Sequence, residues 1–401
     1  MRIKFSLIMI LLASCTLQFS TAQQKLRLKE AGETIAAANL LPAYLNQLKD
    51  KNIALVANQS SIVGKTHLLD TLISSGIQVK VIFTPEHGFR GDQDAGASIN
   101  NSRDSKTGLP IISLYGKHKM PTAADLAEID LLVFDLQDVG VRFYTYISTL
   151  TYVMEACARQ SIPVMVLDRP NPNGFFVDGP VLDSQYTSFV GLHKIPIVYG
   201  LTIGEYALMV NGEGWLPDGL HCDLTIIPMN NYDRFAIDKL PTKPSPNLPN
   251  HQSIYLYPSL CLFEGTAISI GRGTAFPFQV FGHPELKSFP FTFEPQKSPG
   301  ASQPKHESKT CYGKDLRSFA DNFQDHHLYQ LNLDWIIEAY RSFPDKDSFF
   351  NAYFEKLAGT STLRKQIEQG MSSEEIRASW KDELDAYKKI RIKYLQYPDF
   401  E

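Results

Sequence analysis

The chain has 401 residues, of which 43% are hydrophobic and 20% are charged, and its formal net charge is −4. This composition is typical of a globular protein of about two domains. The slight acidity, with both signs of charge mixed along the chain, gives no electrostatic basis for binding nucleic acid. After the first 22 residues, no apolar run is long enough to span a bilayer.

The N-terminus has the pattern of an export signal. Arg2 and Lys4 precede the apolar run 5–13, which is too short for a membrane span and typical of a signal peptide. Two processing sites compete: a lipobox at 12–15 predicts a signal of residues 1–14 and a lipid-modified Cys15, whereas Ser-Thr-Ala predicts ordinary cleavage after residue 22. Either way, we expect an exported protein of the periplasm or envelope, which contacts the membrane only through a lipid on Cys15.

Cysteine usage leaves the redox state open. The processed chain keeps four distant cysteines without the Cys-x-x-Cys spacing of a zinc site or a redox pair. One or two disulfides are compatible with an oxidising compartment, whereas apolar surroundings favour plain burial for Cys157 and Cys261.

Apolar runs alternate with helical segments in the first half of the chain. The patterns predict a helix at 147–160 and buried strands at 53–57, 79–83, 111–114, 131–136 and 163–167. Continuously apolar strands that alternate with helices are typical of a parallel sheet covered on both faces. The sequence therefore predicts an α/β fold built on a Rossmann-like sheet.

A stretch rich in proline, asparagine and lysine, from about 233 to 258, is the best domain boundary. We expect a Rossmann-like catalytic domain at 28–252 and a C-terminal domain at 253–401. Residues 283–313 are rich in proline, serine and lysine and predict a long surface excursion, after which the tail is helical. Two Ser/Thr-x-x-Glu patterns, at 202–205 and 372–375, predict capping boxes, so Glu205 is interpreted as a cap and not as a catalyst.

Polar side chains follow four of the predicted strands. In a parallel sheet the carboxyl ends of the strands face the crevice where ligands bind, so four such clusters predict a binding site. The clusters are Asn58, then Glu86 with His87, then Gln137 with Asp138, and finally Asp168, Arg169 and Asn171.

The sequence lacks the motifs for several ligands and nucleophiles that are common in such a crevice. There is no Gly-x-Gly-x-x-Gly after the first strand, no Walker motif and no Gly-x-Ser-x-Gly nucleophile elbow. The histidines are scattered, without a His-Glu-x-x-His or other paired spacing. We therefore expect neither a dinucleotide, nor a metal, nor another cofactor.

The turn after the second strand holds the leading candidate for acid–base chemistry. Glu86 lies at a strand end next to His87 and near Arg90, where burial and charge can move the pKa of a carboxyl in opposite directions. The alternative is that Glu86 only pairs with Arg90 and braces the turn. His87 is as readily a hydrogen-bonded structural residue as a catalytic one.

The segment 138–146 combines aromatic and polar side chains on the way into a helix. Flat apolar rings beside hydrogen-bonding groups are suited to a sugar, and Tyr144 and Tyr146 are the candidates for such contacts. The alternative is that both tyrosines only form the wall of the helix N-terminus. In the last polar loop, Asp168 and Arg169 have the alternative of pairing with each other.

At this point the motifs resemble those of the NamZ family of exo-β-N-acetylmuramidases, long known only as a bacterial domain of unknown function. The resemblance covers nearly all of the processed chain and rests on Val-Ala-Asn-Gln-Ser (56–60), Thr-Pro-Glu-His-Gly-Phe-Arg-Gly (84–91), Asp-Leu-Gln-Asp-Val-Gly-Val-Arg-Phe-Tyr-Thr-Tyr (135–146), Asp-Arg-Pro-Asn-Pro (168–172), Phe-Glu-Gly-Thr (263–266) and Gly-Arg-Gly-Thr (271–274).

The resemblance implies a Rossmann-like domain, a smaller C-terminal α/β domain and a cleft between them. It implies release of N-acetylmuramic acid from the non-reducing end of peptidoglycan fragments. The proposed catalytic glutamate of the family falls on Glu86, and a tyrosine, either Tyr144 or Tyr146, is the suggested partner.

Glycoside hydrolysis usually requires two carboxyl groups. Asp138 and Glu264 are the candidates for the second, and the acetamido group of the substrate or a tyrosine could replace it. The lactyl carboxylate of muramic acid calls for a cation, which Arg90, Arg142 or Arg272 could supply.

Two other functions fit the same sequence. A fold of two α/β domains around a cleft also suits a non-catalytic envelope protein that binds sugars. A peptidoglycan deacetylase or amidase would act on the same sugar with a different product.

Overall fold

A computed structural model describes residues 27–29, 34–86, 88–89, 102–238, 240–322 and 329–400, with the backbone only at 27–29 and 236–238. The predicted signal segment with Cys15, and the candidate site residues His87 and Arg90, lie outside the described residues.

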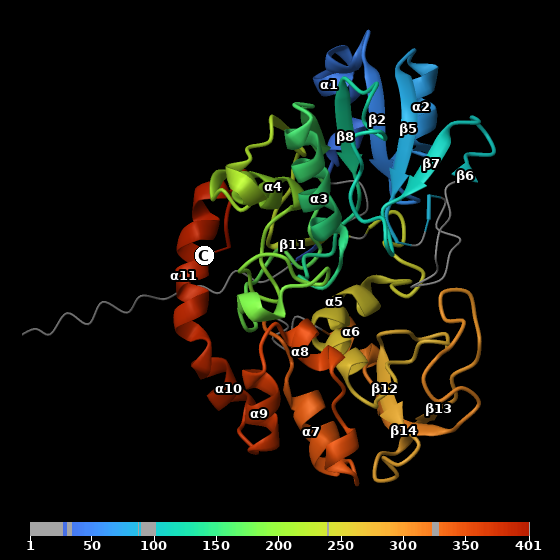
Figure 1. Ribbon diagram of the computed structural model, residues 1–401. Helices are drawn as coiled ribbons and strands as arrows, with labels where there is room; N and C mark the ends of the chain where they lie inside the picture. Colours follow the sequence, from blue (N-terminus) through green and yellow to red (C-terminus); the bar gives the residue numbers. More distant parts are fainter. Residues whose placement is uncertain are drawn as a thin grey trace, which may run out of the picture.

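The first half of the chain is organised around a seven-stranded sheet of order β10-β9-β8-β2-β5-β7-β6 (Figure 1). All neighbours pair in parallel except β6, which is antiparallel to β7. The strands are β2 (Asn52–Ala57), β5 (Gln78–Thr84), β6 (Ser102–Arg103), β7 (Pro110–Ser113), β8 (Leu131–Asp135), β9 (Val164–Leu167) and β10 (Leu224–Ile227). The predicted α/β fold with a parallel sheet is confirmed.

Alternate residues of each strand enter different hydrophobic layers. Ala54 and Val56 of β2 belong to the cluster that includes residues of α3 (Tyr146–Arg159) and α4 (Ile203–Gly212). Ile53 and Leu55 belong to the cluster that includes residues of α1 (Leu41–Leu48) and α2 (Leu68–Ser74). Both faces of the sheet are therefore covered, which is why its strands are apolar without interruption.

The strand order reverses direction at β2. From β2 the chain adds β5 and β7 on one side, and it then returns to add β8, β9 and β10 on the other side. The loops after β2 and β8 therefore leave the sheet in opposite directions, and in sheets of this kind ligands bind in the crevice so created.

The C-terminal half, residues 251–400, lies beyond the carboxyl ends of these strands (Figure 1). It has an antiparallel sheet of order β12-β14-β13 and mostly short helices. These elements are α5 (His251–Leu260), β12 (Val280–His283), β13 (Phe291–Phe293), β14 (Cys311–Asp315), α6 (Arg317–Asp321), α7 (Asp334–Ser342), α8 (Tyr353–Ala358), α9 (Thr362–Glu368), α10 (Ser373–Ser379) and α11 (Lys381–Arg391).

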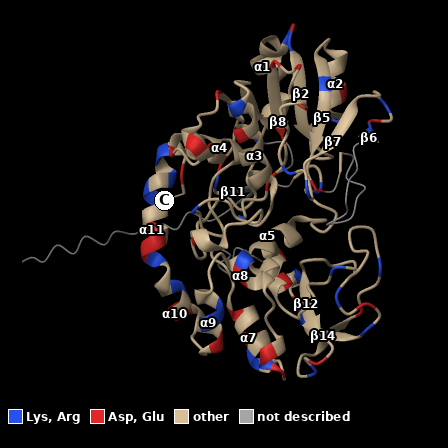
Figure 2. Cartoon of the chain, in the orientation of Figure 1, with Lys and Arg blue, Asp and Glu red and all other residues tan. Residues whose placement is uncertain are grey.

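Helix α11 runs back along the side of the molecule, so that the C-terminal segment reaches the sheet (Figure 1). Tyr397 Oη donates a hydrogen bond of 2.7 Å to Asp168 at the end of β9. Basic and acidic residues are interspersed along α11, and neither sign predominates along the cartoon of the chain (Figure 2). Two short pairs complete the strands: β1 (Arg27–Lys29) with β11 (Ala236–Asp238), and β3 (Ile62–Val63) with β4 (Thr66–His67).

Both predicted capping boxes are confirmed, at the start of α4 and at the start of α10. The expected surface excursion at 283–313 is wrong in part, because β13 and part of β14 lie within it. Gly313 explains the weak sequence signal. A Cβ there would lie 1.7 Å from the Phe281 carbonyl oxygen, so β14 requires glycine at this position, and glycine has a low propensity for strands.

The four described cysteines are buried and free. Over the described ranges, no helix has both the length and the apolar character needed to cross a bilayer.

Candidate functional site

A cavity of about 170 Å³ lies where the strand-end loops meet the C-terminal half. Segments far apart in the sequence contribute to its wall. The lining residues are Glu86, Tyr115, Phe143, Tyr144, Thr145, Tyr146, Phe189, Val190, Ser245, Asn247, Leu248, Tyr257, Cys261, Glu264, Arg272, Phe278, Tyr353 and Leu357.

Glu86 is half-buried and follows β5 directly after Pro85. The hydroxyl of Tyr115, in the loop after β7, forms a hydrogen bond with the Glu86 carboxylate. Burial and the Glu86 charge raise the pKa of Tyr115 to about 12, so this hydroxyl keeps its proton and acts as the donor. Glu86 is therefore held in the cavity wall by a partner in the loop that follows the neighbouring strand.

Tyr144 and Tyr146 form an aromatic corner beside Glu86. Their rings meet edge to face, with centroids 4.7 Å apart. Tyr146 Oη accepts a hydrogen bond of 2.8 Å from Asn58 Nδ2, and Tyr144 Oη donates one of 2.8 Å to the Pro244 carbonyl. Burial raises the pKa of both phenols, and the Glu86 carboxylate adds to the effect at Tyr146.

Asn58 reaches Tyr146 because both lie at the point where the strand order reverses. Its side-chain oxygen accepts hydrogen bonds from Ser60 N and Ser60 Oγ, which fixes the amide so that its nitrogen points at the tyrosine. Asn58 is fully buried and therefore supports the cavity wall from behind.

Glu264 and Arg272 line the same cavity from the C-terminal half. Arg272 Nε donates a hydrogen bond of 2.6 Å to Glu264 Oε1, and each side chain keeps a quarter of its surface exposed. Cys261 lies close by, with its Sγ 3.9 Å from Glu264 Oε2. Burial raises the pKa of the Cys261 thiol, which excludes it as a ready thiolate nucleophile.

The structure does not bring Asp138 or Arg142 to this cavity. Asp138 is buried, accepts hydrogen bonds from Gly140 N and from the Tyr199 hydroxyl, and has its pKa raised to about 7 by burial. Arg142 is fully buried, and its guanidinium donates to four backbone carbonyls, those of Pro180, Ile195, Leu357 and Ala358. Arg142 therefore joins the strand-end loops to α8.

The polar residues of the loop after β9 also form contacts within the protein and do not line the cavity. Asp168 accepts hydrogen bonds from Thr202 Oγ1 and Gly204 N at the start of α4, and burial raises its pKa to about 6. Arg169 does not pair with Asp168; it forms a two-bond ion pair with Asp135, at 2.6 and 2.8 Å.

Asn171 holds two loops together away from the cavity. Its side chain donates a hydrogen bond of 2.8 Å to the Leu201 carbonyl and accepts one from Asn173 N. Gly140 approaches it so closely that a Cβ there would lie 2.1 Å from Asn171 Oδ1. Position 140 therefore requires glycine for two reasons: this close packing and its positive φ of 74°.

Sequence reasoning missed several lining aromatics. Tyr115 follows β7, so the rule that selected the other strand-end residues could have found it. Tyr257 on α5 and Tyr353 on α8 carry no such signal, because their helices come to the cavity only through the tertiary fold. Tyr353 lines the cavity although 39% of the residue is exposed.

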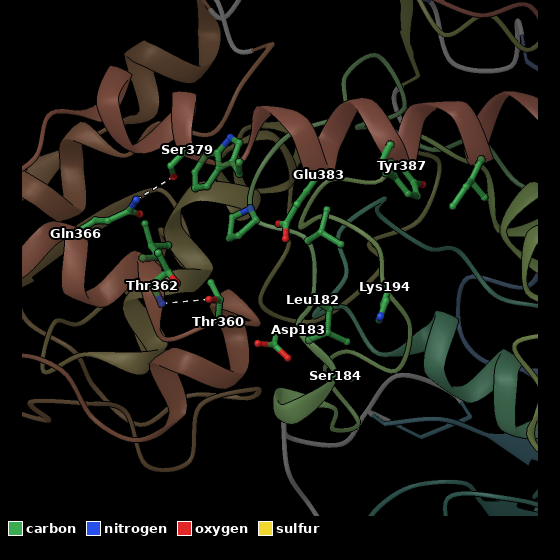
Figure 3. Close-up of a pocket in the computed structure, with 16 residues that line it drawn as sticks. Leu182, Asp183, Ser184, Lys194, Thr360, Thr362, Gln366, Ser379, Glu383 and Tyr387 are labelled. Carbon is green, nitrogen blue, oxygen red and sulfur yellow. Dashed lines mark hydrogen bonds between the residues drawn. The ribbon is translucent and has the colours of Figure 1, made fainter.

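A second cavity, of about 530 Å³, lies between the loop that contains Asp183 and helices α9 to α11 (Figure 3). It is larger, but none of the predicted site residues lines it. Its polar groups partly bond to one another, as Gln366 does to Ser379 at 2.9 Å. The smaller cavity is the better candidate because it joins two carboxyl groups, an arginine and several tyrosines at the switch point of the sheet.

Comparison with known proteins decides the family. Residues 53–252 match the family described as "Exo-beta-N-acetylmuramidase NamZ, N-terminal", and residues 255–397 match its C-terminal counterpart. The chain belongs to the NamZ family. A curated NamZ-family relative, the peptidoglycan beta-N-acetylmuramidase NamZ of Bacillus subtilis (strain 168), is 40% identical over 377 residues, which cover 89% of this chain and 90% of that protein.

Solved structures agree with this assignment. A DUF1343 family protein from Bacteroides fragilis is 47% identical, with a TM-score of 0.84 over 91% of this chain and 99% of the other. A second such protein from the same organism is 29% identical, with a TM-score of 0.75 over the same shares. The resemblance to the NamZ family drawn from the motifs is thereby confirmed.

Proposed function

We propose that the protein is an exo-acting glycoside hydrolase that releases N-acetylmuramic acid from the non-reducing end of peptidoglycan fragments, with Glu86 as its general acid and base. Membership of the NamZ family supports the reaction and the substrate. The observation that supports Glu86 is its place in the cavity wall, at a strand end beside the switch point of the sheet.

The first step would be protonation of the glycosidic oxygen by Glu86. A carboxyl group held by Tyr115 has a fixed direction, which general acid catalysis requires of its proton donor. The aromatic corner of Tyr144 and Tyr146 would offer its ring edges and faces to the C–H surface of the sugar.

The second catalytic group is open to two assignments. Glu264 is the other carboxyl group among the described lining residues, and it forms an ion pair with Arg272. Tyr146 is the alternative, because its hydroxyl lies within electrostatic reach of the Glu86 carboxylate. Exceptions to the two-carboxyl scheme include a tyrosine nucleophile and assistance by the acetamido group of the substrate.

The test is incubation with a chromogenic β-N-acetylmuramide and with muropeptides, followed by mass spectrometry of the products. We expect free N-acetylmuramic acid. Loss of acetate or of peptide would identify a deacetylase or an amidase, and no release at high enzyme concentration would leave a sugar-binding protein.

We also propose export, since peptidoglycan lies outside the cytoplasm and residues 1–22 have a signal pattern. Mass spectrometry of the processed N-terminus tests this: Gln23 at the N-terminus would support cleavage after residue 22, a lipidated Cys15 would support an anchor, and an intact Met1 would contradict both.

The proposed domains, 28–252 and 253–401, would enclose the substrate between them, because Glu86 comes from the first and Glu264 from the second. Limited proteolysis that cuts near 252 and leaves two stable fragments would support this division.

A further inference from the structure

Arg272 lies in the wall of the Glu86 cavity with most of its hydrogen-bonding capacity unused. Its Nε donates to Glu264 Oε1, and its guanidinium lies over the Phe278 ring at 5.0 Å. Neither terminal nitrogen donates a hydrogen bond to any residue that the structure describes, and neither is buried from solvent. Two nitrogens of a fixed guanidinium are therefore open to a ligand.

Several other described arginines donate through two or more nitrogens. Arg169 with Asp135, Arg317 with Asp315 and Arg391 with Asp399 each form two-bond pairs with both carboxylate oxygens. Arg142 gives both terminal nitrogens to backbone carbonyls. Among the described arginines that sequence reasoning offered for carboxylate binding, Arg272 alone lines the cavity and keeps this fork free.

A second cation supports the same loop. Lys305 Nζ lies within hydrogen-bonding distance of the carbonyls of Phe263, Glu264, Thr266 and Ile268, at 3.2, 3.1, 2.6 and 3.3 Å, and its three N–H groups are shared among them. It is close enough for its charge to interact with both Glu264 and Arg272. Lys305 therefore adds a second positive charge close to the Glu264–Arg272 pair, which favours an anionic ligand there.

We propose that Arg272, oriented by Glu264, binds the lactyl carboxylate of N-acetylmuramic acid and so selects this sugar over N-acetylglucosamine. The inference rests on the proposed function and identifies the Arg272 guanidinium as the group that recognises the substrate. Glu264 accepts the hydrogen bond from Arg272 Nε, so both terminal nitrogens of Arg272 remain as a bidentate donor. This geometry suits a planar carboxylate. N-acetylglucosamine lacks the lactyl group and would leave the fork unpaired.

The experiment compares two substrates that differ only at the lactyl group, where a charged carboxylate is replaced by a neutral carboxamide of similar shape. One is 4-nitrophenyl β-N-acetylmuramide, and the other is the same compound with its lactyl carboxyl converted to a carboxamide. Both are measured as kcat/KM with the wild type, Arg272→Gln, Arg272→Lys and the control Arg317→Gln. Arg317 resembles Arg272 in pairing with a carboxylate and lying over a phenylalanine ring, but it is outside the cavity.

We expect the wild type and Arg317→Gln to prefer the acid over the amide by roughly 10- to 100-fold, the range for a lost charge-assisted contact. Arg272→Gln should cleave both substrates at similar low rates, and Arg272→Lys should keep part of the preference because it keeps the charge without the fork. Thermal unfolding of each variant shows whether Glu264 tolerates the loss of its partner.

Two outcomes would overturn the inference while leaving the proposed function intact. One is a folded Arg272→Gln variant that still prefers the acid as strongly as the wild type does. The other is a wild type that cleaves acid and amide equally. If the wild type releases nitrophenol from neither substrate, the proposed function fails and the inference fails with it.

Discussion

Asn58 Nδ2 donates a hydrogen bond of 2.8 Å to Tyr146 Oη, and this contact joins the end of β2 to the first residue of α3. The two residues are 88 positions apart, and they meet because the strand order reverses between β2 and β8. The contact fixes a tyrosine at the switch point, next to the carboxyl group that we assign to catalysis.

This contact distinguishes the two tyrosines. Both hydroxyls donate to the Pro244 carbonyl, Tyr144 at 2.8 Å and Tyr146 at 3.4 Å, but only Tyr146 also interacts electrostatically with Glu86 among the causes of their pKa shifts. We expect Tyr146→Phe to lower kcat by about 100-fold, the lower end of the range for a group that assists proton transfer. Tyr144→Phe should lower kcat by about 10-fold or less, because it removes only a hydrogen bond to the backbone. Steady-state kinetics on the chromogenic muramide measure both, and a larger effect for Tyr144→Phe would contradict this order.

Arg142 is predicted to act through stability. Lysine at this position has three donors and cannot satisfy four carbonyls, so Arg142→Lys leaves buried acceptors unpaired. We expect the free energy of unfolding to fall by about 2–4 kcal/mol, with the activity of the folded fraction retained. Urea unfolding measures the change, and Arg159→Lys on the exposed side of α3 is the control. Unchanged stability of Arg142→Lys together with lost activity would instead indicate that Arg142 contacts the substrate.

Asp138 should make stability depend on pH. Burial raises its pKa from 3.8 to about 7, so between these values the native protein keeps a proton that the unfolded chain releases. The free energy of unfolding therefore falls as pH rises through this window. An asparagine side chain cannot ionise, so Asp138→Asn should gain stability relative to the wild type from pH 5 to pH 8, by an amount on the order of a few kcal/mol.

Urea unfolding of both proteins at several pH values between 5 and 8 tests this. Other titrating groups, including Asp168, are the same in the two proteins and cancel in the difference. Parallel pH profiles for the wild type and Asp138→Asn would show that Asp138 ionises normally.

The parallel sheet was predictable because its strands are buried on both faces and therefore continuously apolar, as in β2. The antiparallel sheet was not, because β13 and β14 are short and partly exposed, and because β14 contains Gly313. Periodicity carries little signal where a strand is short and packs on few neighbours.

The site was predictable only in part, because a strand end identifies a position and not the direction of a side chain. Glu86 and Tyr146 do point to the cavity, and Glu264 and Arg272 meet there across eight positions of the chain. Arg142 instead reaches the Ala358 carbonyl, 216 positions away, which no local pattern could indicate. Asp168 caps the distant helix α4 for the same reason.

The role of Glu86 is tested most directly by Glu86→Gln, which keeps the shape of the side chain and an acceptor oxygen for Tyr115 but cannot ionise and so cannot act as an acid or a base. The measurement is release of nitrophenol from 4-nitrophenyl β-N-acetylmuramide, with Glu128→Gln, an exposed glutamate, as the matched control. We predict that Glu86→Gln loses at least about 1,000-fold in kcat with an unchanged melting temperature, while the control keeps full activity. Turnover by folded Glu86→Gln within a few-fold of the wild type would contradict the account.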